Sequence, residues 1–212
     1  MIAEFSPYIS GFIIAYSILI VAASSPGPSV AMLIGIAVDQ GRTAALTATL
    51  GVAFGSITIN ILTLLGVGFL LSQAAWAMTI LRVIGALYLL YLAFGAFKKA
   101  FSPTSLVPTT TKQTPLFQHF IKAYLLQVTN PKAIAFWLAI ASVGAVEGAS
   151  LLVVGGFVFG AFIISFTCHG AWALALSVER VRKGYVAARR WVELFLGGVF
   201  VFAAYKVVTS SE

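Results

Sequence analysis

The sequence predicts an all-α integral membrane protein in which six transmembrane helices form two inverted three-helix repeats. Three observations support this fold class: an apolar composition, a series of long apolar segments, and two prolines about half a chain apart. Of the 212 residues, 60% are hydrophobic and 9% are charged, and the mean hydropathy is +1.02. Because a soluble domain carries about 25% charged residues, this chain has too few polar groups to cover a surface in water. The lipid bilayer is therefore the expected environment.

The apolar segments each reach the length of roughly 17–25 residues that crosses the hydrocarbon core. They cover residues 10–37, 44–71, 79–97, 118–145, 149–177 and 191–208. The polar segment 98–117 is predicted to be the central loop, and the basic segment 179–190 a second loop. Glu147 and Glu193 lie near the ends of spans, where we expect interfacial positions.

The basic residues lie between the apolar segments rather than on one polar face. With the N-terminus outside the cell, ten basic side chains fall on the cytoplasmic side: Arg42, Lys98, Lys99, Lys112, Lys122, Arg180, Arg182, Lys183, Arg189 and Arg190. Arg82 and Lys206 fall outside, and Lys132 lies within a span. This bias predicts that both termini are outside. It also accounts for the net charge of +7 without a nucleic-acid partner.

An internal repeat is indicated by two pairs of matching positions. Pro28 and Pro131 lie 103 residues apart, and "GVAFG" (51–55) precedes "GFVFG" (156–160) by 105 residues. The chain then divides into a first half, residues 1–103, and a second half, residues 104–212. Because each half has an odd number of spans, the second enters the membrane inverted, an arrangement typical of transporters. Chance similarity between apolar helices is the alternative.

The first span is interrupted by "SSPGPS" (24–29), which places Pro26, Gly27 and Pro28 inside an apolar segment. A proline lacks an N–H group, and the ring of Pro28 would clash with the carbonyl of Ser24 in a continuous helix. Pro28 precedes Asp39 by 11 residues, about 16 Å of helix, which places the break near mid-depth. A helix is broken at that depth only where it lines a cavity or is buried in protein.

The fourth span has the same feature at "TNPKA" (129–133), where Asn130 is a good N-cap and Pro131 a good first helical residue. Both half-helices then begin at mid-depth, and their N–H groups and partial positive charges favour a carboxylate. Carbonyls freed near Ser24 and Gln127 would accept from an ammonium group. The two breaks therefore predict a binding site for a zwitterion. Alternatively, the prolines only kink packed helices.

Three segments carry a resemblance to a known family: "SSPGPSVAMLIGIAVDQGRTAALTATLGVAFG", "IGALYLLYLAFGAFKK" and "LLQVTNPKAIAFWLAI". They resemble the LysE/RhtB family of bacterial amino-acid exporters over nearly the whole chain. The family's motif positions match Pro26, Gly27, Pro28, Gly41, Gly51, Asn130, Pro131 and Lys132. Ser29 stands where the family often has Asn or Asp, and Ala45 where it often has glycine. The resemblance implies secondary efflux of amino acids or small metabolites through the bacterial inner membrane, driven by the proton gradient.

The candidate substrate-binding residues are the two breaks and the polar side chains at similar depth. They are Pro26, Gly27, Pro28, Ser29, Asn60, Gln127, Asn130, Pro131 and Lys132. A basic group deep in a span usually marks function, so Lys132 is predicted to bind a substrate carboxylate. The alternative is that Lys132 snorkels or pairs with a backbone carbonyl. Asn60 contacts substrate or forms hydrogen bonds between helices.

Three further residues are candidates for coupling or gating: Asp39, Arg42 and His169. Asp39 and Arg42 lie at the inner end of the first span, where they gate the pathway or are simply solvated. His169 is a candidate proton relay because histidine titrates near neutrality. A structural role for His169 is the alternative.

The sequence lacks the side-chain clusters of other functional classes. His119 and His169 are its two histidines, and no converging set of catalytic or metal-binding residues is apparent, so we expect no enzyme, cofactor or metal site. The predicted function is secondary active export of amino acids or similar small zwitterions, coupled to protons. A small channel, or an exporter of another solute or of a metal ion, is the alternative. Small-residue faces on spans two and five suit a homodimer or contacts within one subunit.

Overall fold

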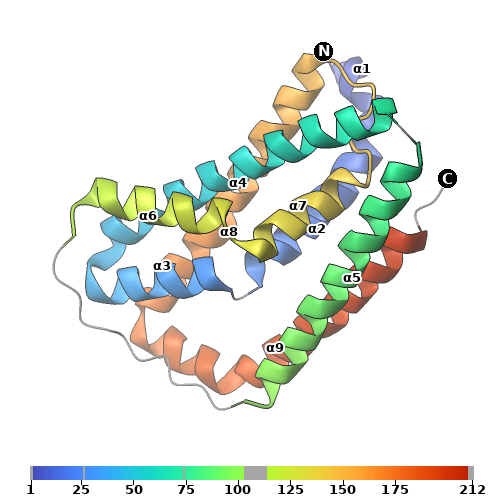
Figure 1. Cartoon of the computed structure of the whole chain (residues 1–212). Helices are drawn as coiled ribbons and strands as arrows, with labels where there is room; N and C mark the ends of the chain where they lie inside the picture. The colour runs from blue at the N-terminus through green and yellow to red at the C-terminus, as the bar shows by residue number, and fades with distance from the viewer. Residues whose placement is uncertain (1, 26, 74, 103–113, 210–212) are drawn as a thin grey trace.

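The computed structural model describes residues 2–25, 27–73, 75–102 and 114–209, and this part of the chain is built from helices without strands (Figure 1). In chain order the elements are α1 (Ile2–Phe5), the 3₁₀ turn η1 (Ser6–Tyr8), α2 (Ile9–Ser24), α3 (Pro28–Asp39), α4 (Gly41–Gln73), α5 (Ala75–Ala100), α6 (Leu116–Val128), α7 (Pro131–Ala141), α8 (Leu151–Ser177) and α9 (Glu179–Thr209). The predicted all-α class is confirmed for the described residues.

The structure has the apolar helices of a membrane protein. Within the described residues, three helical stretches are long and apolar enough to cross a bilayer, namely Ser6–Ser24, Gly41–Gly66 and Leu151–Ser177. Two shorter apolar helices, Pro28–Asp39 and Pro131–Ala141, follow the two breaks. Large apolar side chains are also exposed on the outer surface, as expected where lipid replaces water. The exact count of six spans stays a prediction.

Both predicted helix breaks are confirmed. α2 ends at Ser24, and α3 begins at Pro28 with Gly27 as its N-cap residue. α7 begins at Pro131, and the side chain of Asn130 caps it by accepting a hydrogen bond from the backbone N–H of Lys132 at 3.0 Å. Pro26 lies outside the described residues.

The predicted second loop, 179–190, is wrong because this segment is the first part of α9. In Figure 1 it lies along the lower edge of the molecule before α9 rises beside α5. Glu179 and Lys183 form an ion pair of 2.7 Å one turn apart, an arrangement that supports an exposed helix. A hydropathy pattern identifies the apolar part of a helix but does not show whether the helix continues into a polar segment. Of the predicted central loop, residues 103–113 lie outside the described part.

The helices pack in a small number of close pairs. α5 packs along α9, while α4 packs against both α6 and α8, and α2 and α3 also contact α8. A Cβ atom on Gly51 would collide with the backbone carbonyl of Phe120 in α6, and one on Gly55 would lie 2.9 Å from Cβ of Gln127. On α8, a Cβ on Gly156 would lie 2.8 Å from the ring of Phe5. These glycines therefore serve close packing within one subunit.

Candidate transport site

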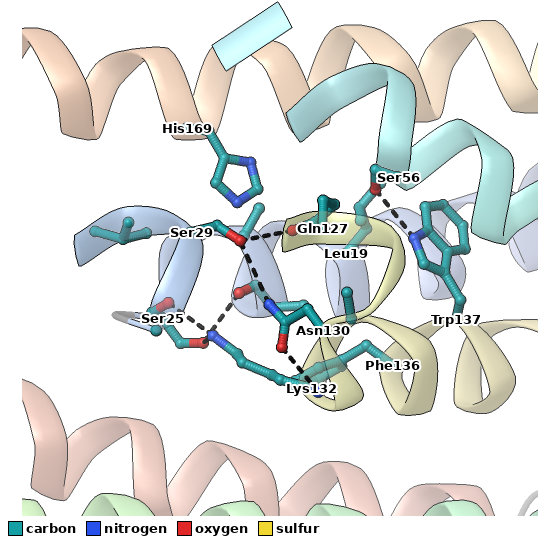
Figure 2. Close-up of a pocket in the computed structure, with 15 residues that line it drawn as sticks. Leu19, Ser25, Ser29, Ser56, Gln127, Asn130, Lys132, Phe136, Trp137 and His169 are labelled. Atoms are coloured by element: carbon teal, nitrogen blue, oxygen red, sulfur yellow. Dashed lines mark hydrogen bonds between the residues drawn. The ribbon is translucent and has the colours of Figure 1, made fainter. Parts of the chain in front are cut away.

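The two helix breaks lie side by side near the centre of the molecule, where they bound a cavity of about 30 Å³ (Figures 1 and 2). This volume suits about two water molecules. The cavity is lined by residues from both breaks and from α4, α6 and α8; the polar ones are Ser25, Ser29, Ser56, Gln127, Asn130, Lys132 and His169. Most of the sequence-predicted binding residues therefore come together at one place.

A buried chain of hydrogen bonds joins the two breaks. Ser29, the second residue of α3, donates from its hydroxyl to Oε1 of Gln127 in α6 at 2.6 Å. Nδ2 of Asn130 in turn donates to the hydroxyl oxygen of Ser29 at 3.4 Å. All three side chains are buried. The first turn of α3 is thus held against the α6–α7 break, as the matched prolines predict.

Lys132 reaches from α7 into the break between α2 and α3. Its Nζ atom donates to the backbone carbonyl of Ser25 at 2.7 Å and also contacts the Ser25 hydroxyl closely (Figure 2). Gly27 makes room for this amino group, because a Cβ atom there would lie 3.2 Å from Nζ. Pairing with a backbone carbonyl, one of the alternatives for this residue, is thus what the structure contains.

The carbonyl groups freed by the breaks already have partners. The carbonyl of Ser24 accepts a hydrogen bond from Nε1 of Trp172 in α8 at 3.1 Å, and that of Ser25 accepts from Lys132. The backbone carbonyl of Gln127 accepts from the N–H of Asn130 at 3.1 Å. The acceptors that the sequence suggested for a substrate ammonium are therefore occupied in this conformation.

The N-termini of the two half-helices differ in their capping. The side chain of Asn130 caps the N-terminus of α7, whereas no side chain of the described residues caps the N-terminus of α3. The partial positive charge at the start of α3 lies beside the Lys132 ammonium, which packs against Gly27. The electrostatic potential is therefore more favourable for an anionic group at the N-terminus of α3 than at the N-terminus of α7.

His169 lines the cavity from α8 and is 7% exposed. Its Nδ1 atom lies 2.8 Å from the backbone carbonyl of Ser165, one turn earlier in the same helix. In Figure 2 the ring extends from α8 towards Ser29. His169 therefore faces the same cavity as Lys132. This proximity could not be predicted from the sequence.

Five predicted residues are not part of the cavity lining: Pro28 and Pro131, which begin α3 and α7, and Asp39, Arg42 and Asn60. Asp39 ends α3, and Arg42 in the first turn of α4 donates to the Ser177 hydroxyl at 3.3 Å. Asn60 is buried one turn beyond Ser56 on α4, and its side-chain amide has no hydrogen-bond partner among the described residues. Ser56 itself lines the cavity and accepts from Nε1 of Trp137 at 3.0 Å.

One residue that sequence reasoning placed at the membrane interface is buried instead. Glu193 on α9 is 3% exposed, and it is the one buried acid among the described residues. It lies on the same face of α9 as Leu196 and Phe200, which pack with Phe136 of the cavity wall. The helical extension 179–190 moves Glu193 well inside α9, and no hydropathy signal marks that extension.

Comparison with known proteins identifies the family of this chain and several relatives. The family model for LysE type translocators matches residues 20–211. The threonine efflux protein of Salmonella typhimurium strain LT2 is 30% identical over 191 residues, which cover 85% of this chain and 89% of that protein. The threonine efflux protein of Escherichia coli K12 is 28% identical over 199 residues, covering 89% and 93%.

A leucine efflux protein of Salmonella choleraesuis is 31% identical over 114 residues, which cover 54% of this chain and 53% of that protein. No solved structure shows a significant match. The family match contains both helix breaks and every polar residue of the cavity lining named above. The chain therefore belongs to the LysE type translocator family and is a transport protein rather than an enzyme.

Proposed function

We propose that this protein exports small amino acids from the cytoplasm as a secondary active carrier coupled to protons. The observation that carries the proposal is the cavity between two broken helices, with the Lys132 amino group held at the break of the other repeat. The names of the threonine and leucine efflux relatives support an uncharged side chain on the substrate. Among the described lining residues Lys132 is the only charged one, which suits a zwitterion better than a cation.

The substrate carboxylate is assigned to Lys132 and the uncapped start of α3. An anion there gains a charge-assisted contact with Nζ and the favourable end of the helix dipole. Gly27 leaves space for both, since even a methyl group would approach Nζ to 3.2 Å. The cavity of about 30 Å³ has room for about two water molecules, so we expect the two breaks to move apart when an amino acid is loaded.

The packing pattern supports the inverted-repeat part of the proposal. α2 packs on α8 and α6 packs on α4, so the first helix of each proposed half contacts the second helix of the other. Gly51 and Gly55 lie at the contact between α4 and α6, and Gly160 lies at the contact between α8 and α2. The start of α1 and the end of α9 lie towards the same end of the molecule in Figure 1, as an even number of crossings requires. A homodimer and termini outside the cell remain part of the proposal.

Counterflow into proteoliposomes tests the function. Vesicles containing the purified protein are loaded with 10-fold or greater excess of unlabelled L-threonine or L-leucine, and labelled amino acid is added outside. A carrier accumulates label transiently because exchange is faster than net movement. A channel gives simple equilibration without overshoot, and a carrier of other solutes or of metal ions gives no movement of either amino acid.

A further inference from the structure

The orientation of the His169 imidazole fixes which of its nitrogens is available to the cavity. Nδ1 lies 2.8 Å from the carbonyl oxygen of Ser165, and a carbonyl oxygen can only accept a hydrogen bond. Nδ1 therefore carries a hydrogen and donates it along α8. In a neutral ring this leaves Nε2 with an unprotonated lone pair, on the side of the ring that extends towards Ser29 in Figure 2.

Other acceptors at the cavity are already in use. Oε1 of Gln127 accepts from Ser29, Oδ1 of Asn130 accepts from the N–H of Lys132, and the Ser25 carbonyl accepts from Nζ of Lys132. Nε2 of His169 has no hydrogen-bond partner among the described residues. It is therefore the open nitrogen acceptor of the cavity for the ammonium group of a substrate.

The charges around His169 are few. Lys132 on α7 is the charged group among the described lining residues, and it is in turn influenced by the charges of Lys99 on α5 and Glu193 on α9. The polar side chains contributed to the lining by the break after α2, by α3 and by α4 are the uncharged Ser25, Ser29 and Ser56. Cys168, the preceding residue of α8, interacts with Ser24.

We propose that Nε2 of His169 is a shared site, occupied either by the ammonium group of the substrate or by the coupling proton. The inference rests on the proposed function and deepens it. A neutral ring accepts one N–H from the substrate ammonium, while a ring protonated at Nε2 has no lone pair and repels a cation. Substrate and proton therefore exclude each other, which is the condition for exchange rather than co-transport.

The cycle balances in charge. The neutral ring binds the zwitterion from the cytoplasm and releases it outside, where a proton from external water binds Nε2. The protonated ring faces the cytoplasm again and loses that proton to water before the next substrate binds. Each cycle moves a neutral amino acid out and one proton in, so export is electrogenic.

The test uses the full-length protein in proteoliposomes with L-threonine and L-leucine as probes. His169→Gln keeps an acceptor oxygen near Nε2 but cannot titrate. We expect accumulation driven by a pH gradient and the accompanying proton flux to fall by at least tenfold in this variant, whereas counterflow, which needs an acceptor but no titration, should fall much less. The control is His119→Gln, which changes the other buried histidine, bonded to Gln40 away from the cavity, and should retain both activities.

A measurement on the unmodified protein keeps the inference testable if His169→Gln does not fold. Because proton and substrate compete, the substrate concentration for half-maximal exchange should rise as pH falls, by up to about tenfold per pH unit. Half-saturation that is constant from pH 4 to 8 overturns the inference, and so does gradient-driven accumulation by His169→Gln. In either case, counterflow by the unmodified protein would leave the proposed export function standing. Absence of counterflow would instead remove the proposed function itself.

Discussion

The amino group of Lys132 lies 2.7 Å from the carbonyl oxygen of Ser25, so a side chain at the start of α7 completes the backbone of the break between α2 and α3. A deep ammonium group is costly in a membrane protein unless it has such a partner. The contact joins residues 107 positions apart in the sequence. It also places the one charged group of the described lining at the position assigned to the substrate carboxylate.

Replacement of Lys132 by glutamine is predicted to weaken substrate binding. Loss of one charge-assisted contact costs on the order of 1.5–3 kcal/mol, which is a factor of about ten or more in affinity. Lys132→Arg keeps the charge in a bulkier head group and should retain part of the function. Uptake into inside-out vesicles at graded amino-acid concentrations measures the effect. Unchanged half-saturation in Lys132→Gln would contradict the carboxylate assignment.

The prolines at the starts of α3 and α7 are predicted to be needed for transport more than for folding. Pro28→Ala and Pro131→Ala each restore an N–H group and permit a more regular helix. Protein levels should hold or rise while the transport rate falls. Membrane abundance and counterflow rate are measured on the same preparations. If both variants transport at the parental rate, the prolines only kink packed helices.

Close packing between α4 and α6 is predicted to depend on Gly51. In Gly51→Ala the new methyl group collides with the backbone carbonyl of Phe120, and backbone cannot rotate away as a side chain can. Overpacking of this kind costs about 1–3 kcal/mol. Gly66→Ala in the same helix is the matched control, since no atom lies within 4 Å of the added Cβ. Thermal stability in detergent should fall for the first variant only.

Membrane topology is predicted from the basic residues and is tested by single cysteines in a Cys168→Ser background. Lys183 and Glu147 are both exposed, and the predicted topology places them on opposite sides of the membrane. In intact cells a membrane-impermeant thiol reagent should label Glu147→Cys and leave Lys183→Cys unmodified. The reverse pattern would overturn the orientation, and equal labelling would overturn the number of crossings between the two positions.

The parts of the fold that were predictable from the sequence follow from local chemistry. Pro28 and Pro131 cannot continue a helix, and Asn130 is a good cap, so both breaks could be predicted without knowledge of the packing. The position of Lys132 in the first turn of α7 follows from the same cap and proline. These features depend on one or two neighbours in the chain.

The features that the sequence did not predict depend on contacts between distant segments. Glu193 is buried because it lies on the face of α9 that also carries Leu196 and Phe200, which pack in the core. The free nitrogen of His169 depends on the ring orientation set by Ser165, and the occupied carbonyl of Ser24 depends on Trp172. The unpartnered amide of buried Asn60 likewise has no signal in hydropathy.

The carbonyl groups of Ser24 and Ser25 have hydrogen-bond partners within the chain before any substrate binds. Trp172 and Lys132 belong to the chain itself, so the unwound turn between α2 and α3 is satisfied before any cargo arrives. Unwinding a helix in hydrocarbon is unfavourable when its polar groups are left bare. Here that cost is met during folding, so an arriving solute meets an unwound turn whose Ser24 and Ser25 carbonyl groups already have partners. Affinity then reflects the exchange of one set of polar partners for another.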